Sequence, residues 1–409
     1  MVLGGLICLA ISMAVMVILS ALGVNVAICI LAGLLVFGLT ALGPRGLGLS
    51  MLATLTDIET WDITVSVALI AILGSVMREL GQLDDIMEGL RGLGVRGRPL
   101  MALSSTLMGL LPVPGGAILS ASVVEEEGRS MGADERGSAT ANLLFRHLNF
   151  FAYPLSPALI FLASSEVLGI GMPILMLALL PASLAHIVSS SISSFYGMKP
   201  SRPPSGSGDT DRKACLMRLL RGLTPILIAP ILGALGLGLS ASICVSLATS
   251  LLLAGLRGGL GDLLNRAAGG LRKSKAYSFA LPILFAMMFR RAFKSSGISG
   301  AFGGLLSASP LPEGLTLCLL ALVLGLATGT VTLPVITVLP PDVGLLEGVM
   351  AYTGAVTGYI ISPLHLCFIL TAEYFGLRQA KMYPRLLAYA VLTLSISLPL
   401  TLALAGFLP

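Results

Sequence analysis

Helix-breaking residues inside apolar runs are the features of this sequence that could build a binding site. The apolar stretch 100–124, LMALSSTLMGLLPVPGGAILSASVV, contains Pro112, Pro114, Gly115 and Gly116. Proline removes a helical donor and glycine weakens a helix, so two short arms around an irregular tip are predicted. At about 1.5 Å per residue, neither arm crosses a hydrocarbon core of about 30 Å. A single kinked span is the alternative.

A re-entrant hairpin, which enters the membrane and returns to the same face, would account for this stretch. Irregular backbone is tolerated at membrane depth only where it is buried in protein or lines a cavity. The tip, together with Ser120 on the second arm, is therefore a candidate site for a substrate or an ion.

A second interrupted stretch, 315–339, has a weaker break at its tip, ATGTVT. Hydroxyls and freed carbonyls suit a dehydrated alkali ion or the oxygens of an anion. Threonines in membrane helices also bond their own backbone, so a purely structural role stays open. The candidate residues of this tip are Thr328, Gly329, Thr330 and Thr332.

The apolar run after each interrupted stretch also contains a break, NFFAYPLSP at 149–157 and YTGAVTGYIISP at 352–363. Half-helix N-termini at such breaks present positive partial charge to an anion. A Pro-kinked helix that binds nothing is the alternative for each break alone. The candidate residues are Asn149, Tyr153, Ser156, Thr353, Thr357, Ser362 and His365.

Charged or titratable side chains near these breaks are few. Arg146 and His147 open the run that follows the first hairpin. Arg146 is expected either to anchor the cytoplasmic interface or, with His147, to contact an anion. His365 is expected either to relay a proton or to be a buried, hydrogen-bonded histidine.

The remaining charged groups are assigned to other places. Arg78 and Arg290 are expected at membrane interfaces, and Glu166 and Glu373 in water. No carboxylate pair stands within a span, no phosphate loop is present, and no catalytic Ser–His or Asp–Asp arrangement is found, so an enzyme is not expected. The six cysteines are scattered, and no Cys or carboxylate is spaced to join the three histidines. No metal site and no cofactor are therefore expected.

Composition places these residues in a membrane. The 409 residues are 56% hydrophobic and 11% charged, with a mean hydropathy of +0.96. A chain with so little polar material is predicted to be an all-α polytopic membrane protein. The net charge of +5 comes from loops between spans, so no nucleic-acid partner is expected. The first apolar run lacks a preceding basic segment and is expected to remain as a span.

The order of apolar runs repeats along the chain. Spans are predicted at 2–20, 24–42, 62–80, 142–164 and 171–197, and after the linker at 218–238, 240–256, 275–292, 347–373 and 383–408. The run ALIAILGSVMRELGQLDDI from Ala68 resembles ALPILFAMMFRRAFKSSGI from Ala280. A polar linker at 198–213 would divide a first repeat, 1–197, from a second, 214–409.

The basic residues predict how the repeats lie in the membrane. If both interrupted stretches are re-entrant, only four of the 25 basic residues fall on the minority side, namely Arg45, Arg290, Arg291 and Lys294. The majority side is then cytoplasmic, with the linker there and both termini outside the plasma membrane. Each half crosses five times, an odd number, so the halves would be inverted repeats. Hairpin 100–124 would enter from the cytoplasm and hairpin 315–339 from outside.

The motifs LLPVPGGAILSAS from Leu110 and FRHLNFFAYPLSPAL from Phe145, with inverted halves, resemble the ion transporter superfamily. Locally the sequence is most similar to the domain of unknown function 401 family. The superfamily includes carriers of gluconate, citrate, dicarboxylates and lactate, besides arsenite and sodium/proton exchangers. The resemblance implies a scaffold of early spans, a moving unit of hairpins and broken helices, an elevator-type cycle and a homodimer.

The hairpin tips depart from those of the sodium-coupled dicarboxylate carriers. Those carriers have Ser-Asn-Thr at each tip, whereas this sequence has Pro-Val-Pro-Gly-Gly and Thr-Gly-Thr-Val-Thr. The resemblance therefore carries over the location of the site but not its ligand. The function expected is ion-coupled symport of a small organic anion by alternating access, with Na⁺ or H⁺ as coupling ion and membrane lipid as surroundings. A cation/proton antiporter and a channel are the alternatives.

Overall fold

The computed structural model describes residues 2–111, 116–198, 211–256, 259–297 and 309–404. Every regular element assigned in these ranges is a helix, which confirms the predicted all-α class. Three of the predicted tip residues, Pro112, Pro114 and Gly115, lie outside the described residues, as does most of the 198–213 linker.

Twelve helices precede the linker: α1 (Val2–Ala21), α2 (Val26–Ala41), α3 (Gly43–Leu55), α4 (Ile58–Glu79), α5 (Gln82–Gly92), α6 (Gly97–Gly109), α7 (Gly116–Ser130), α8 (Glu135–Arg146), α9 (Asn149–Ala152), α10 (Pro157–Ala163), α11 (Met172–Ala178) and α12 (Leu180–Phe195). The described helices after it are α13 (Arg212–Ala234), α14 (Leu239–Gly255), α15 (Leu260–Lys273), α16 (Tyr277–Ser295), α18 (Glu313–Thr328), α19 (Thr332–Val338), α20 (Leu345–Ile361), α21 (Leu366–Tyr374), the 3₁₀ turn η1 (Gln379–Lys381) and α22 (Tyr383–Leu404).

Side-chain caps fix where several of these helices begin. The Asn25 side chain accepts a hydrogen bond from the backbone N–H of Ala27 at the start of α2. Asp57, Asp134 and Asp211 do the same at the starts of α4, α8 and α13. Such caps satisfy N–H groups that have no partner within the helix.

Several predicted spans are broken or short. The run 142–164 contains the end of α8, the single turn α9 and the short helix α10. Helices α11 and α12 meet at an angle of 49°. By length and composition, four helical segments among the described residues can cross a membrane, or six if each bent pair is one span. The protein is therefore a multi-pass membrane protein. Other predicted spans, such as those at α2 and α14, form apolar helices of 16 and 17 residues, so the number of ten spans stays a prediction.

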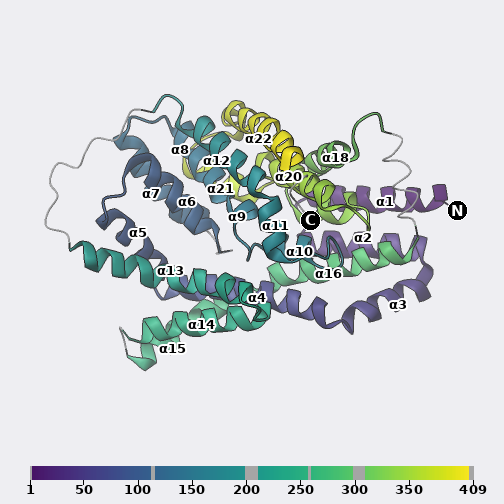
Figure 1. Cartoon of the computed structure of the whole chain (residues 1–409), viewed down its shortest axis with the longest axis horizontal. Coiled ribbons are helices and arrows are strands. Elements are labelled where there is room, and N and C mark those ends of the chain that lie inside the picture. The colour runs from purple at the N-terminus through teal and green to yellow at the C-terminus, as the bar shows by residue number, and fades with distance from the viewer. Residues whose placement is uncertain (1, 112–115, 199–210, 257–258, 298–308, 405–409) are drawn as a thin grey trace.

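The helices pack mainly in two sets (Figure 1). The first set contains α1 to α5 and α13 to α16, and the second contains α6 to α12 and α18 to α22. Most extensive contacts join members of the same set, such as α13 with α5 or α12 with α22. Contacts between the sets include α16 with α19 and α10, and α1 with α18. Both interrupted stretches thus belong to the second set, which packs against the first.

Both interrupted stretches form pairs of packed helices. Helices α6 and α7 lie side by side (Figure 1), and the outer ends are joined because Glu127 Oε2 accepts a hydrogen bond from the backbone N–H of Gly97 at 2.5 Å. An ion pair between Arg91 and Glu126 lies at the same end. In the second stretch, Gly329 ends α18 with φ +61°, a left-handed conformation that favours glycine.

Candidate functional site

A cavity of about 460 Å³ lies where the interrupted segments of both halves meet. From the first half of the chain, the cavity is lined by the end of α6, the start of α7, the junction of α8 and α9, and the start of α10. From the second half, it is lined by one face of α16, the tip between α18 and α19, the end of α20 and the start of α21. Most of the wall is apolar. The polar lining residues are Arg146, His147, Asn149, Ser278, Thr330, Thr332, Tyr359 and Cys367.

Among the described residues that line this cavity, Arg146 alone carries a formal charge. It is the last residue of α8 and is only 7% exposed. Its Nη1 atom is buried without a hydrogen-bond partner among the described residues, as is Oδ1 of Asn149, which also lines the cavity. A buried guanidinium nitrogen without a partner is costly unless a ligand completes it. This position therefore suits an anionic group.

His147 and His365 meet beside the cavity although 218 residues separate them in the chain. Their Nε2 atoms are 3.1 Å apart. The Nδ1 atom of His147 contacts the carbonyl oxygen of Leu143 at 2.6 Å, and that of His365 contacts the carbonyl oxygen of Ile360 at 3.4 Å. Both rings are almost completely buried. The contact joins the break of one half to the break of the other.

The second tip also reaches the cavity. Gly329, Thr330 and Thr332 line it. Thr328 directly precedes these lining residues, and its hydroxyl donates a hydrogen bond to the carbonyl oxygen of Leu324 at 2.7 Å. The hydroxyls of Thr328 and Thr330 are 3.3 Å apart. The tip thus presents hydroxyls to the cavity while one of them also bonds its own helix.

Most of the remaining predicted residues form hydrogen bonds with backbone carbonyls of the protein. The hydroxyl of Tyr153 donates to the carbonyl oxygen of Ile226, and that of Ser362 donates to the carbonyl oxygen of Leu326. Thr353 and Thr357 each donate to a carbonyl four residues earlier in α20. Ser156 is buried with an unpartnered hydroxyl, and Gly116 begins α7. The sequence could not distinguish these residues from those that line the cavity, because a hydroxyl in a membrane helix can either bond a backbone carbonyl or face a ligand.

Asn142 holds the first hairpin in place and was not among the predicted residues. Its Oδ1 accepts a hydrogen bond from Ser120 at 2.7 Å, and its Nδ2 donates to the carbonyl oxygen of Ala117 at 3.0 Å and to Thr371 Oγ1 at 3.2 Å. The amide thus connects α7 and α21 to α8. A lone asparagine in the run ATANLLF was the one signal in the sequence that could have indicated it.

We expect Asn142→Leu to destabilise the protein by about 2–4 kcal/mol, because it leaves buried partners of the amide unsatisfied. Thermal unfolding in detergent measures the change. Asn25→Leu removes a partly exposed cap and is the control, with an expected cost of about 1 kcal/mol. Equal unfolding temperatures for the two variants would show that the Asn142 network contributes nothing special.

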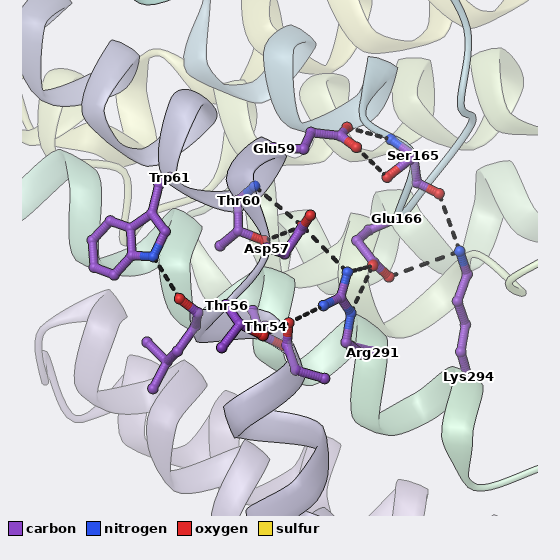
Figure 2. A network of polar contacts seen from close by, with 12 residues as sticks. Thr54, Thr56, Asp57, Glu59, Thr60, Trp61, Ser165, Glu166, Arg291 and Lys294 are labelled. Carbon is purple, nitrogen blue, oxygen red and sulfur yellow. Dashed lines mark hydrogen bonds and ion pairs between the residues drawn. The ribbon is translucent and has the colours of Figure 1, made fainter.

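A second polar cluster joins the two helix sets away from the cavity (Figure 2). Arg291 on α16 contacts Glu166 Oε1 at 2.9 Å and Asp57 Oδ2 at 3.2 Å. Glu59 accepts hydrogen bonds from the backbone N–H and the hydroxyl of Ser165, at 2.9 and 2.6 Å. Burial raises the pKa of the Asp57 carboxyl, but hydrogen bonds from Thr60 and the charge of Arg291 outweigh it and lower that pKa below its ordinary value.

Two of the sequence-based assignments are wrong in this cluster. Glu166, expected in water, is 5% exposed and paired with Arg291 and Lys294. Arg290, expected at a membrane interface, is completely buried. Its guanidinium donates to the carbonyl oxygens of Glu166, Leu339 and Pro340, which lie at the ends of broken segments. Freed carbonyls attract a buried arginine, whereas hydropathy alone places arginine at an interface. Arg78 and Glu373 are both exposed. The interfacial position of Arg78 stays a prediction.

The fold and the cavity define a multi-pass membrane protein whose apolar helices break around a shared internal cavity. The chain belongs to the family of proteins of unknown function DUF401, whose profile matches residues 3–404. This confirms the resemblance to the domain of unknown function 401 family noted in the sequence. No curated protein matches the chain. Its fold is similar to that of the Alcanivorax borkumensis YdaH transporter, with a TM-score of 0.62 and 13% identity over 89% of each chain.

Proposed function

We propose that this protein is an ion-coupled secondary active transporter of a small organic anion that works by alternating access. The observation that carries the proposal is the buried Nη1 of Arg146. Among the described residues this atom has no partner, and no other described residue of the cavity lining is charged. A carboxylate would complete that guanidinium, and the apolar wall would hold the organic part of the substrate. The structural likeness to a transporter supports the same class.

The arrangement of the helices supports an elevator-type cycle between inverted repeats. Hairpin α6–α7 and the broken helices after it have counterparts in α18–α19 and the break between α20 and α21. The set that contains them would be the moving unit, and the set of α1 to α5 and α13 to α16 would be the scaffold. The joined outer ends of α6 and α7 favour a re-entrant hairpin, since both ends of such a hairpin share one face.

The rest of the proposal follows from the sequence. The protein would sit in the plasma membrane with both termini outside, as a homodimer in which the scaffolds meet. Na⁺ or H⁺ would drive uptake. A cation/proton antiporter is less consistent with the cavity, because its lining carries a positive charge and no carboxylate. A channel would need a continuous polar path, whereas the wall of this cavity is mainly apolar.

Uptake by the full-length protein in liposomes tests this function. We expect labelled organic acids, screened under imposed sodium and proton gradients, to include one that accumulates saturably and only with a gradient. Conductance without saturation would indicate a channel instead. Absence of uptake for mono-, di- and tricarboxylates under both gradients, by protein that is folded and correctly inserted, would contradict the proposed substrate class.

A further inference from the structure

The Nε2 atoms of the two histidines beside the cavity lie 3.1 Å apart. In both rings the Nδ1 atom faces a backbone carbonyl, that of Leu143 at 2.6 Å and that of Ile360 at 3.4 Å. A neutral imidazole carries one N–H hydrogen. In the tautomer in which each Nδ1 donates to its carbonyl, the two Nε2 atoms face each other as acceptors, and a cation between them would stabilise that arrangement.

The thiol of Cys367, a third possible metal ligand, lies close to the two histidine rings. One ring nitrogen of His147, one ring nitrogen of His365 and the Sγ atom of Cys367 all lie within 4.8 Å of one another. Cys367 comes two residues after His365, at the start of α21, whereas His147 follows α8. Spacing in the sequence could not reveal this group, because His147 lies in the other half of the chain.

We propose that His147, His365 and Cys367 bind a transition-metal ion with a preference for imidazole and thiolate, of which Zn²⁺ is the prime example. Tetrahedral Zn²⁺ with Zn–N bonds of about 2.0–2.1 Å places two nitrogens about 3.3 Å apart, close to the distance between these two Nε2 atoms. Two nitrogens and a thiolate select such an ion over Na⁺, Mg²⁺ or Ca²⁺, which prefer oxygen.

The surroundings of the three residues fit a metal site. Histidines that bind a metal usually donate the other ring N–H to a carbonyl or carboxylate, and in both of these rings the Nδ1 atom faces a backbone carbonyl oxygen that could accept it. His147 and Cys367 also line the cavity, so a fourth coordination position would open into it. The charge of Arg146 opposes a cation there, and the Cys367 thiol, which loses its proton on binding, offsets that charge.

Titration of the chelator-treated, full-length protein with Co²⁺ tests the site. We expect one Co²⁺ per chain, with the visible bands of tetrahedral Co²⁺ and a thiolate-to-Co²⁺ charge-transfer band, and displacement of both by Zn²⁺. Cys367→Ser should lose the charge-transfer band, and His365→Gln should weaken binding at least about tenfold. Cys244→Ser, which removes an exposed thiol elsewhere, should leave the spectrum unchanged.

X-ray absorption of the Zn²⁺-loaded unmodified protein gives a second readout that needs no variant, with two nitrogen and one sulfur ligands expected. Absence of the bands in folded, monodisperse protein would overturn the proposal and leave a proton as the cation between the rings. Loss of the charge-transfer band in Cys244→Ser, or its persistence in Cys367→Ser, would do so as well. These measurements do not depend on transport, so failure of the uptake assay leaves them valid.

Discussion

Replacement of Arg146 by methionine is expected to lower uptake of the transported anion by about two orders of magnitude. Methionine keeps much of the volume of the side chain but removes the one charge that the described part of the chain brings to the cavity lining. A hydrogen bond to a charged group contributes about 1.5–3 kcal/mol, which corresponds to roughly 10- to 150-fold in affinity. Initial rates of uptake in liposomes, measured over a range of substrate concentrations, should show the loss mainly as a raised KM.

Arg146→Lys separates binding from anchoring. Lysine keeps the charge but cannot match the planar fork of a guanidinium, so we expect intermediate uptake if Arg146 binds a carboxylate. Arg272→Met, at an exposed position of α15, is the matched control and should transport normally. If Arg146→Met inserts and transports like this control, Arg146 serves only as an anchor, and the anion site lies elsewhere.

Substitution of Gly358 by alanine is expected to give the second large effect, on the packing of α18 against α20. A Cβ atom at Gly358 would lie 2.1 Å from the carbonyl oxygen of Leu322, and one at Gly354 would lie 2.1 Å from that of Cys318. Backbone atoms at that distance cannot move aside without separating the two helices. We expect a loss of about 2–4 kcal/mol in the free energy of unfolding.

Gly48→Ala provides the matched control for this prediction. Gly48 lies inside α3, and a Cβ atom there would have nothing within 4 Å. Alanine is about 1 kcal/mol better than glycine within a helix, so the control should be neutral or slightly stabilised. Thermal unfolding in detergent gives the comparison. A Gly358→Ala protein as stable as Gly48→Ala would mean that α18 and α20 are not closely packed.

The sequence predicted the local breaks well because Pro, Gly and Ser-Pro pairs act on their own backbone. The tip at Gly329, the break between α9 and α10 at Pro154 and Ser156, and the break at Ser362 all occur where these residues stand. The break directly after Arg146 has no such residue. The repeated order of parts predicted that the tips and breaks of the two halves converge, and Arg146, Asn149 and Thr330 all line the cavity described above. Their role in binding stays a prediction.

Long-range partners could not be predicted in this way. Asn142 and Thr371 are 229 residues apart, and His147 and His365 are 218 apart, so no spacing rule connects either pair. Arg290 and Glu166 were assigned by hydropathy to interfaces or water, although both are buried by partners from distant segments. The additional helices α3, α5 and α15 carry no long apolar run, and a search for spans passes over them.

The most direct test of the account asks on which side of the membrane each hairpin begins and ends. Single cysteines at the exposed positions Arg96 and Ser130 flank α6–α7, and those at Glu313 and Asp342 flank α18–α19. In a background in which the six native cysteines are replaced by serine, a membrane-impermeant maleimide should label the first pair only from the cytoplasm and the second pair only from outside. Labelling of positions 96 and 130 from opposite sides would contradict the re-entrant hairpin, and with it the inverted repeats and the transport cycle proposed for them.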